Sequence, residues 1–180
     1  MILSWLSTVP DITFDAGLVT YATVTLYPPV SESAMFLSLT LTPGFSAAAP
    51  IFAGETYLPA PKDGDTWSEG EGAAWAFGWF EDARGDGESY VNIIPTAAGG
   101  THEAGLRSGV FDALKSFVDH HNLLPRGVRL QTEDISAHMR YVLSVRVLDP
   151  QFQGQVKEKL TSRDALKLVA QVIRDRLEAW

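Results

Sequence analysis

The segment SYVNIIPTAAGGTHEAGLRSGVFDALKSFVDHH, residues 89–121, decides the fold because its pattern changes from that of a strand to that of a helix. Residues 89–94 are rich in strand-forming side chains. From residue 101 onward apolar side chains recur every three or four positions, which predicts a helix of about five turns. Its apolar stripe comprises Leu106, Val110, Ala113, Leu114 and Phe117. Thr101 is the expected N-cap, and Glu103 lies where the helix dipole favours an acid.

Two further segments have the character of strands. Residues 74–80 are apolar and aromatic, and the link 81–88, with its glycines, is expected to close an antiparallel hairpin between this strand and residues 89–94. Residues 141–148 form a strand too apolar to be an exposed edge, and Asp149-Pro150 ends it.

Two more helices are expected after residue 130. A short one begins near Thr132, where Glu133 and Asp134 suit its positive end. The last begins near Ser162, and its expected buried face comprises Leu166, Val169, Ala170, Ile173 and Leu177. Strands followed by helices in this order predict an α+β fold, a two-layer sandwich with helices on one face of a sheet.

The first part of the chain has a different composition. No lysine or arginine precedes Lys62. Residues 18–26 and 35–42 alternate between apolar and polar side chains, which predicts a half-buried N-terminal β-hairpin. The change in charge near residues 45–70 marks a change of structural role or of origin, and the sequence leaves that origin open.

Composition restricts the class of protein. The 180 residues suit one domain, or one domain with a fragment. The absence of cysteine excludes disulfide frameworks, thiolate metal sites and cysteine nucleophiles. The formal net charge of −8 argues against a protein that grips nucleic acid over a broad surface.

The sequence contains no signal for a membrane or for export. No apolar run reaches the ~18 residues that a membrane span requires. Residues 1–6 lack a basic flank and are followed early by Pro10 and Asp11, unlike a signal peptide. We therefore expect a cytoplasmic protein with no membrane partner.

The polar loop at residues 151–160 is the most suggestive segment for chemistry. It follows an apolar strand, precedes a helix, and carries Lys157 beyond the flexible Gly154. A lysine on such a loop is a mobile charge that can reach a phosphate. Spacing alone favours the plainer interpretation of a solvated lysine.

Other motifs are weaker. Gly99-Gly100 ahead of a helix could cradle an anion, although a plain turn with an N-cap is the favoured interpretation. No two of the four histidines flank a glutamate at helical spacing, and no GxSxG elbow occurs. We expect no metal site in this chain.

The order of several motifs resembles one family. They are residues 88–96, 99–102, 122–128, 133–135 and 141–160. Together they resemble the transducer region of the ATPase (B) subunits of bacterial type IIA DNA topoisomerases, from about Pro50 to Trp180. The segment LPRGV at residues 124–128 looks more like the topoisomerase IV B subunit than the gyrase B subunit. The resemblance implies a transducer domain at residues 49–180 and leaves residues 1–48 as a poorly matched β-rich segment.

The resemblance implies both a fold and two site residues. The family's domain has a ribosomal protein S5 domain 2-like fold with a left-handed crossover. Its Gln-Thr-Lys loop reaches the ATP site of a neighbouring GHKL domain, where glutamine and lysine meet the γ-phosphate. The matching residues are Gln155 and Lys157, with Lys157 as the catalytic candidate, while Val156 stands where the family has threonine.

The resemblance also implies partners and cofactors. ATP and Mg²⁺ serve the parent enzyme and are held mainly by the GHKL domain, whose Glu-plus-Asn and Asp-x-Gly-x-Gly motifs are missing from this sequence. The expected partners are the GHKL and TOPRIM domains of the parent subunit, the topoisomerase A subunit and DNA. The isolated chain is expected to hold no cofactor and to be inactive.

Two alternatives remain open from the sequence. One is a freestanding, non-catalytic interaction module with the same fold, which would compete for a topoisomerase subunit. The other is an S5-like RNA-binding protein, which the charge of −8 disfavours.

Overall fold

The computed structural model describes residues 50–59, 68–81 and 84–180. These residues belong to one compact unit, Ala47–Trp180. The predicted N-terminal β-hairpin lies outside the described residues, and the division of the chain at residue 48 stays a prediction.

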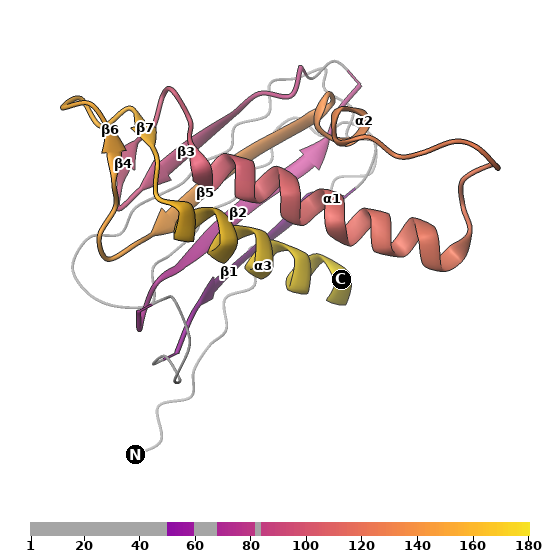
Figure 1. Cartoon of the computed structure of the whole chain (residues 1–180), viewed down its shortest axis with the longest axis horizontal. Coiled ribbons are helices and arrows are strands. Elements are labelled where there is room, and N and C mark those ends of the chain that lie inside the picture. The colour runs from indigo at the N-terminus through magenta and orange to yellow at the C-terminus, as the bar shows by residue number, and fades with distance from the viewer. Residues whose placement is uncertain (1–49, 60–67, 82–83) are drawn as a thin grey trace, which may run out of the picture. The chain divides into compact units, whose positions relative to one another are not determined.

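A five-stranded mixed sheet forms one layer of this unit (Figure 1). Its strands are β1 (Phe52–Tyr57), β2 (Gly72–Trp79), β3 (Gly87–Val91), β4 (Ile94–Pro95) and β5 (Met139–Arg146). Their spatial order is β1-β2-β5-β3-β4. β2 runs antiparallel to both β1 and β5, whereas β3 runs parallel to β5 and antiparallel to β4.

The predicted hairpin between residues 74–80 and 89–94 is wrong, because β5 lies between β2 and β3. The physical reason is the apolar character of β5. Its residues Leu143 and Val145 are almost fully buried, and a central strand has both backbone edges paired and both neighbours to pack against. The expectation that this strand is not an exposed edge is confirmed.

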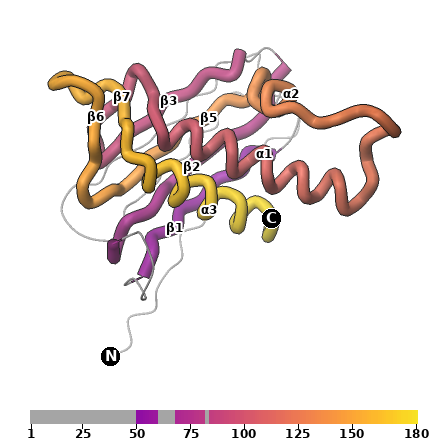
Figure 2. The backbone as a smooth tube through the Cα atoms, viewed as in Figure 1, coloured from indigo at the N-terminus to yellow at the C-terminus, as the bar shows by residue number. Residues whose placement is uncertain are grey.

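Helices form the second layer, which confirms the α+β prediction. They are α1 (Thr101–His121), the short α2 (Thr132–Ser136) and α3 (Arg163–Ala179). α1 and α3 lie side by side against the same face of the sheet (Figure 2). β4, α1 and α2 all belong to the crossover between the parallel strands β3 and β5, because parallel neighbours cannot be joined by a tight turn. The predicted left hand of this crossover stays a prediction.

The core lies between these layers. Its largest fully buried apolar side chains from the sheet are Trp75, Phe77, Met139 and Leu143, and from the helices Leu106, Val110 and Ile173. The stripe predicted for α1 is buried at Leu106, Val110 and Ala113, but Phe117 is 55% exposed. The last turns of α1 extend past the end of α3 (Figure 1), so this end of α1 does not pack against α3.

Two glycines allow α1 and α3 to approach closely. A Cβ at Gly105 would lie 2.6 Å from Leu166 O, and a Cβ at Gly109 would lie 3.1 Å from the Cα of Ala170. These two glycines are one turn apart on α1 and form a surface without side chains. The backbone of α3 packs directly against this surface. Leu166 and Ala170, which we predicted on the buried face of α3, therefore lie half-buried against α1.

The rest of the predicted face of α3 is partly confirmed. Val169, Ile173 and Leu177 are buried as expected. The pattern missed Ala165, Leu168 and Val172, which are also buried. α3 buries a wider arc than one stripe because it packs against both α1 and the core face of the sheet.

The start of α1 differs from the prediction. Its N-cap is Gly100, at a φ of 144°, and Thr101 is the first helical residue. The hydroxyl of Thr101 is buried and has no hydrogen-bond partner in the described part of the chain. Glycine is required at the cap because a Cβ there would lie 2.6 Å from Leu160 N.

Candidate functional site

The loop singled out from the sequence is a small β-hairpin that projects at one end of the unit Ala47–Trp180 (Figure 1). β6 (Phe152–Gln153) pairs antiparallel with β7 (Lys159–Leu160). Leu160 is fully buried and Phe152 packs against the core. Apolar side chains thus anchor the base of the hairpin and leave residues 154–158 as its tip.

The tip presents polar side chains to solvent. Gln155 and Lys157 are both exposed, and Val156 between them is 74% exposed. Gly154 and Lys157 have positive φ values of 74° and 57°, and these left-handed residues turn the chain sharply. The tip therefore brings the two predicted γ-phosphate ligands to one projecting surface.

Lys157 has no ion-pair partner among the described residues. Its Nζ lies 6.0 Å from the centre of the Phe152 ring, at the outer limit of a cation–π contact. An exposed ammonium with only this weak contact keeps its hydrogen-bond donors for an incoming anion.

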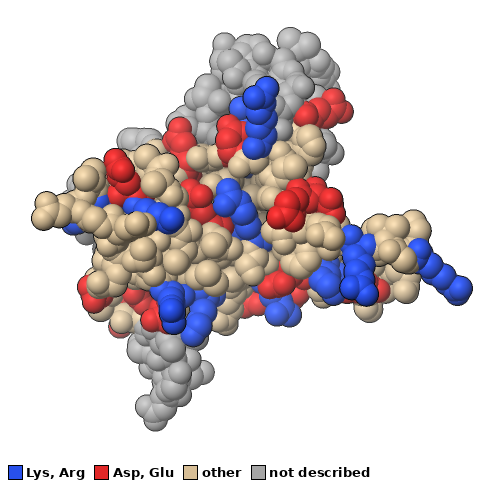
Figure 3. Space-filling view, turned by 45° about the horizontal axis from the view of Figure 1, so that its top comes forward, with Lys and Arg blue, Asp and Glu red and all other residues tan. Residues whose placement is uncertain are grey.

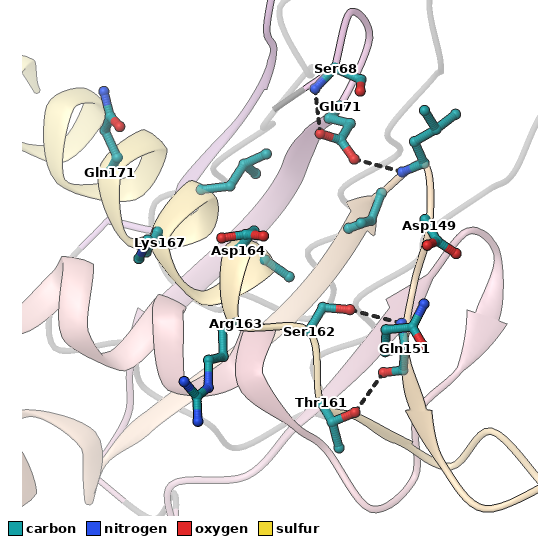
Figure 4. Close-up of a pocket in the computed structure, with 14 residues that line it drawn as sticks. Ser68, Glu71, Asp149, Gln151, Thr161, Ser162, Arg163, Asp164, Lys167 and Gln171 are labelled. Carbon is teal, nitrogen blue, oxygen red and sulfur yellow. Dashed lines mark hydrogen bonds between the residues drawn. The ribbon is translucent and has the colours of Figure 1, made fainter. Parts of the chain in front are cut away.

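One side of the hairpin base is joined to the start of α3. Thr161 donates to Gln151 O from its backbone N–H at 2.7 Å and from its hydroxyl at 3.0 Å. The backbone N–H of Gln151 donates to Oγ of Ser162, the N-cap residue of α3, at 2.8 Å (Figure 4). The position of the hairpin is thus tied to that of α3.

The other side of the hairpin is joined to the turn before α1. Ala98 N–H donates to Glu158 O at 3.0 Å, and Leu160 N–H donates to Gly99 O at 3.1 Å. The backbone of Gly100 lies directly against Leu160. Strand β7 therefore occupies the space beside these glycines, which favours the plain-turn interpretation over an anion cradle.

A pocket of about 500 Å³ lies beside the hairpin base, between the end of β5 and the first turns of α3 (Figure 4). At its wall the buried Glu71 accepts backbone hydrogen bonds of 2.6 Å from both Ser68 and Leu148. Cations (Arg163, Lys167) and acids (Asp149, Asp164) both line it. The sequence did not reveal this pocket, because residues 68–71, far away in the chain, complete a wall that is otherwise formed by residues 147–151 and 161–171.

Charge of both signs is interspersed over the face that Figure 3 shows, without a broad basic surface. Within residues 50–59, 68–81 and 84–180, no three His, Asp or Glu side chains are grouped so that they could hold a metal ion. In the same part of the chain no helix is both long and apolar enough to cross a bilayer.

The sequence of this chain is similar to those of known topoisomerase subunits. Residues 46–180 match the sequence model described as DNA gyrase B. The B subunit of DNA topoisomerase 4 from Pseudomonas aeruginosa is 46% identical over 121 residues, 67% of this chain and 19% of that protein. Its counterpart from Escherichia coli is 46% identical over 122 residues, again 67% of this chain and 19% of that protein.

Solved structures give the same result. The topoisomerase IV ATP-binding domain of Francisella tularensis, in complex with a small-molecule inhibitor, aligns with a TM-score of 0.56 at 33% identity, over 70% of this chain and 33% of that one. The 43K ATPase domain of Thermus thermophilus gyrase B, in complex with an aminocoumarin, aligns with a TM-score of 0.63 at 24% identity. The alignment covers 76% of this chain and 34% of that one. The second likeness shows the fold alone.

The fold is therefore that of part of a type II topoisomerase ATPase region, and the relatives are topoisomerase IV B subunits. The chain belongs to the DNA gyrase B family. It spans about a fifth of the length of the B subunits that it matches.

Proposed function

We propose that residues 49–180 form the transducer domain of a type II DNA topoisomerase B subunit, in which Gln155 and Lys157 sense the γ-phosphate of ATP. The family match and the order of the motifs support this assignment. The sheet with helices on one face and a parallel β3–β5 crossover agrees with the S5 domain 2-like topology that the family implies.

One observation carries the proposal. Lys157 is exposed at the tip of a projecting hairpin and has no carboxylate partner among the described residues. Burial of the amine against a local acid would have removed its ability to meet a phosphate. Gln155 lies two residues away on the same tip and adds an amide donor.

The charge of Lys157 makes it a sensor of nucleotide state. A γ-phosphate adds negative charge at a place where ADP has none. A charge-assisted hydrogen bond contributes roughly 1.5–3 kcal/mol, on the order of 10- to 150-fold in an equilibrium constant. This is sufficient to bias a two-state rotation of the transducer, which loss of the phosphate would release. The same positive charge would help to neutralise the transition state of hydrolysis.

Val156 changes one part of the family motif. A threonine at this position would offer a hydroxyl, whereas the valine side chain is apolar and 74% exposed. The two residues with phosphate-directed donors are kept on either side of it. We therefore propose that the phosphate contact depends on Gln155 and Lys157.

The wider assignment follows from the parent enzyme. A GHKL domain of the parent subunit would hold most of the ATP with its Mg²⁺, and a TOPRIM domain, the A subunit and DNA would complete the enzyme in the cytoplasm. There the domain would couple ATP hydrolysis to DNA strand passage.

A chimaeric subunit tests this function. Residues 46–180 replace the matching segment of the P. aeruginosa B subunit, and ATP turnover is measured with the A subunit and DNA. Lys157→Ala is expected to lower turnover by at least about 100-fold. The matched control is Lys159→Ala, an exposed lysine in β7 of the same hairpin, which is expected to keep turnover within about threefold. Wild-type turnover in Lys157→Ala would remove the proposed role.

A further inference from the structure

A buried polar cluster lies beneath the turn that holds the hairpin. Among the described residues four polar or charged side chains are buried, and Ser89, Thr96 and His102 are three of them. They are 5%, 2% and 0% exposed. They come from β3, from the residue after β4, and from the first turn of α1.

Hydrogen bonds join these side chains into one network. Thr96 Oγ1 donates to Ser89 O at 2.9 Å and lies 2.7 Å from Ser89 Oγ and 3.0 Å from His102 Nε2. Ser89 Oγ donates to Glu103 Oε1 at 2.7 Å. The Thr96 hydroxyl is therefore the centre of the network.

The proton positions follow from this arrangement. Ser89 gives its one hydroxyl proton to Glu103, so Thr96 is the donor toward Ser89, to its Oγ or its carbonyl oxygen. Because this uses the one hydroxyl proton of Thr96, His102 Nε2 carries a proton and donates it to Thr96 Oγ1. His102 Nδ1 is buried without a partner among the described residues. A second proton there would be a buried, unpaired donor on a charged ring, so the ring is neutral and Nδ1 is an acceptor. Burial lowers the pKa of His102 to about 4, in agreement with a neutral ring at pH 7.

The network leads directly to the hairpin. Gly99 N–H donates to Thr96 O at 2.8 Å, which closes the turn at residues 96–99. The same turn receives Leu160 N–H at Gly99 O and offers Ala98 N–H to Glu158 O. One of these bonds closes the turn on Thr96, and the other two join the turn to Glu158 and Leu160 of the hairpin.

The hairpin needs this support. β6 and β7 pair over only two residues each, and an isolated two-stranded ribbon is marginally stable in water. The exposed tip has no packing of its own, so the backbone bonds from the turn, together with the bonds at the base to Gln151 and Ser162, determine where it lies.

We propose that Thr96, held by Ser89 and His102, is a positioning residue that orders the hairpin carrying Lys157. The functional importance of a fixed hairpin position rests on the proposed role of Lys157 as a phosphate sensor. The fixed position itself is a property of the chain without nucleotide.

Amide hydrogen exchange in the full 180-residue chain tests the proposal. Thr96→Val removes the hydroxyl with little change of shape, and Thr96→Ser restores it. Thr96→Val is expected to speed exchange at Ala98 and Leu160 at least about tenfold, while the β5 amides of Leu143 and Val145 change by less than about twofold. Thr96→Ser is expected to behave as the wild type.

Two results would overturn the proposal: unchanged exchange at Ala98 and Leu160, or an equal rise at the β5 amides, which would indicate a general loss of stability. Should Thr96→Val fail to fold, Ser89→Ala removes one arm of the network and is expected to speed exchange at the same two amides by about threefold. Exchange is measured without nucleotide, so its outcome is independent of ATP turnover in the Lys157→Ala chimaera.

Discussion

The backbone N–H of Ala98 donates a hydrogen bond to the carbonyl of Glu158, and this contact joins the turn before α1 to the residue after Lys157. The base of the same hairpin is bonded to Ser162 at the start of α3. A charge at the tip is thereby connected to both long helices of the domain. The proposed phosphate contact would therefore act on a loop that is bonded to the turn before α1 and to the start of α3.

The contact between the two helices is expected to be intolerant of added volume. A Cβ at Gly109 would lie 2.5 Å from Ala170 O, a backbone atom that cannot move independently. Gly109→Ala is therefore expected to lower the free energy of unfolding by about 1–3 kcal/mol, although alanine favours helices. Urea denaturation measures this loss. Ser116→Ala, at an exposed site of α1, is the control, and equal stabilities of the two variants would contradict the close approach.

The carboxylate of Glu71 is expected to hold the end of β5 against the start of β2. It accepts two short backbone hydrogen bonds, from Ser68 and Leu148. Glu71→Gln removes the charge and turns an amide NH₂ toward one of these donors, so a loss of about 2 kcal/mol in unfolding free energy is expected. Glu69→Gln, at an exposed neighbour, should change stability by less than about 0.5 kcal/mol. If Glu71→Gln also lowered the unfolding free energy by less than about 0.5 kcal/mol, the charge-assisted bonds from Ser68 and Leu148 would not contribute to stability.

Buried His102 is expected to make the fold sensitive to acid. Its pKa is about 4 in the folded chain, below the ordinary value of 6.5, so as pH falls the unfolded chain binds the proton first. Stability is therefore lost between pH 6.5 and 4, by on the order of 3 kcal/mol. Chemical denaturation across this range compares the wild type with His102→Gln, which lacks the titrating group. Parallel pH profiles for the two proteins would contradict the neutral buried ring.

The isolated chain is expected to bind ATP weakly. Lys157 and Gln155 offer one charge-assisted contact, worth roughly 1.5–3 kcal/mol, and a 1 mM dissociation constant already requires about 4 kcal/mol. Calorimetric titration should detect no binding tighter than the millimolar range. Micromolar binding would mean that the chain contains a nucleotide site of its own.

The features that sequence predicted correctly are those encoded locally. The stripe of α1 follows from side-chain periodicity and the prediction of β5 from its apolar run. The helix formed where expected, although Phe117 is exposed, and β5 lies two residues earlier than the predicted 141–148. The wrong hairpin between β2 and β3 arose because adjacent strands usually pair, a rule that cannot foresee a later strand inserted between them. Short strands such as β4, β6 and β7 carry too few residues for a periodic signal.

The candidate site, too, was only partly predictable from the sequence. Spacing alone favoured a solvated lysine at position 157, and only the resemblance to a family gave it a function. Its exposure at a projecting tip agrees with both interpretations. The network around Thr96 was invisible in the sequence because its side chains come from β3, the residue after β4 and the first turn of α1, and no periodic pattern marks them.

The most direct test of the central claim is the preference for ATP over ADP in the chimaeric subunit. The dissociation constants of ADP and of a non-hydrolysable ATP analogue are measured with and without Lys157→Ala. ADP affinity is expected to be kept, while the preference for the triphosphate is expected to fall by about tenfold or more. An unchanged preference would contradict a contact between Lys157 and the γ-phosphate.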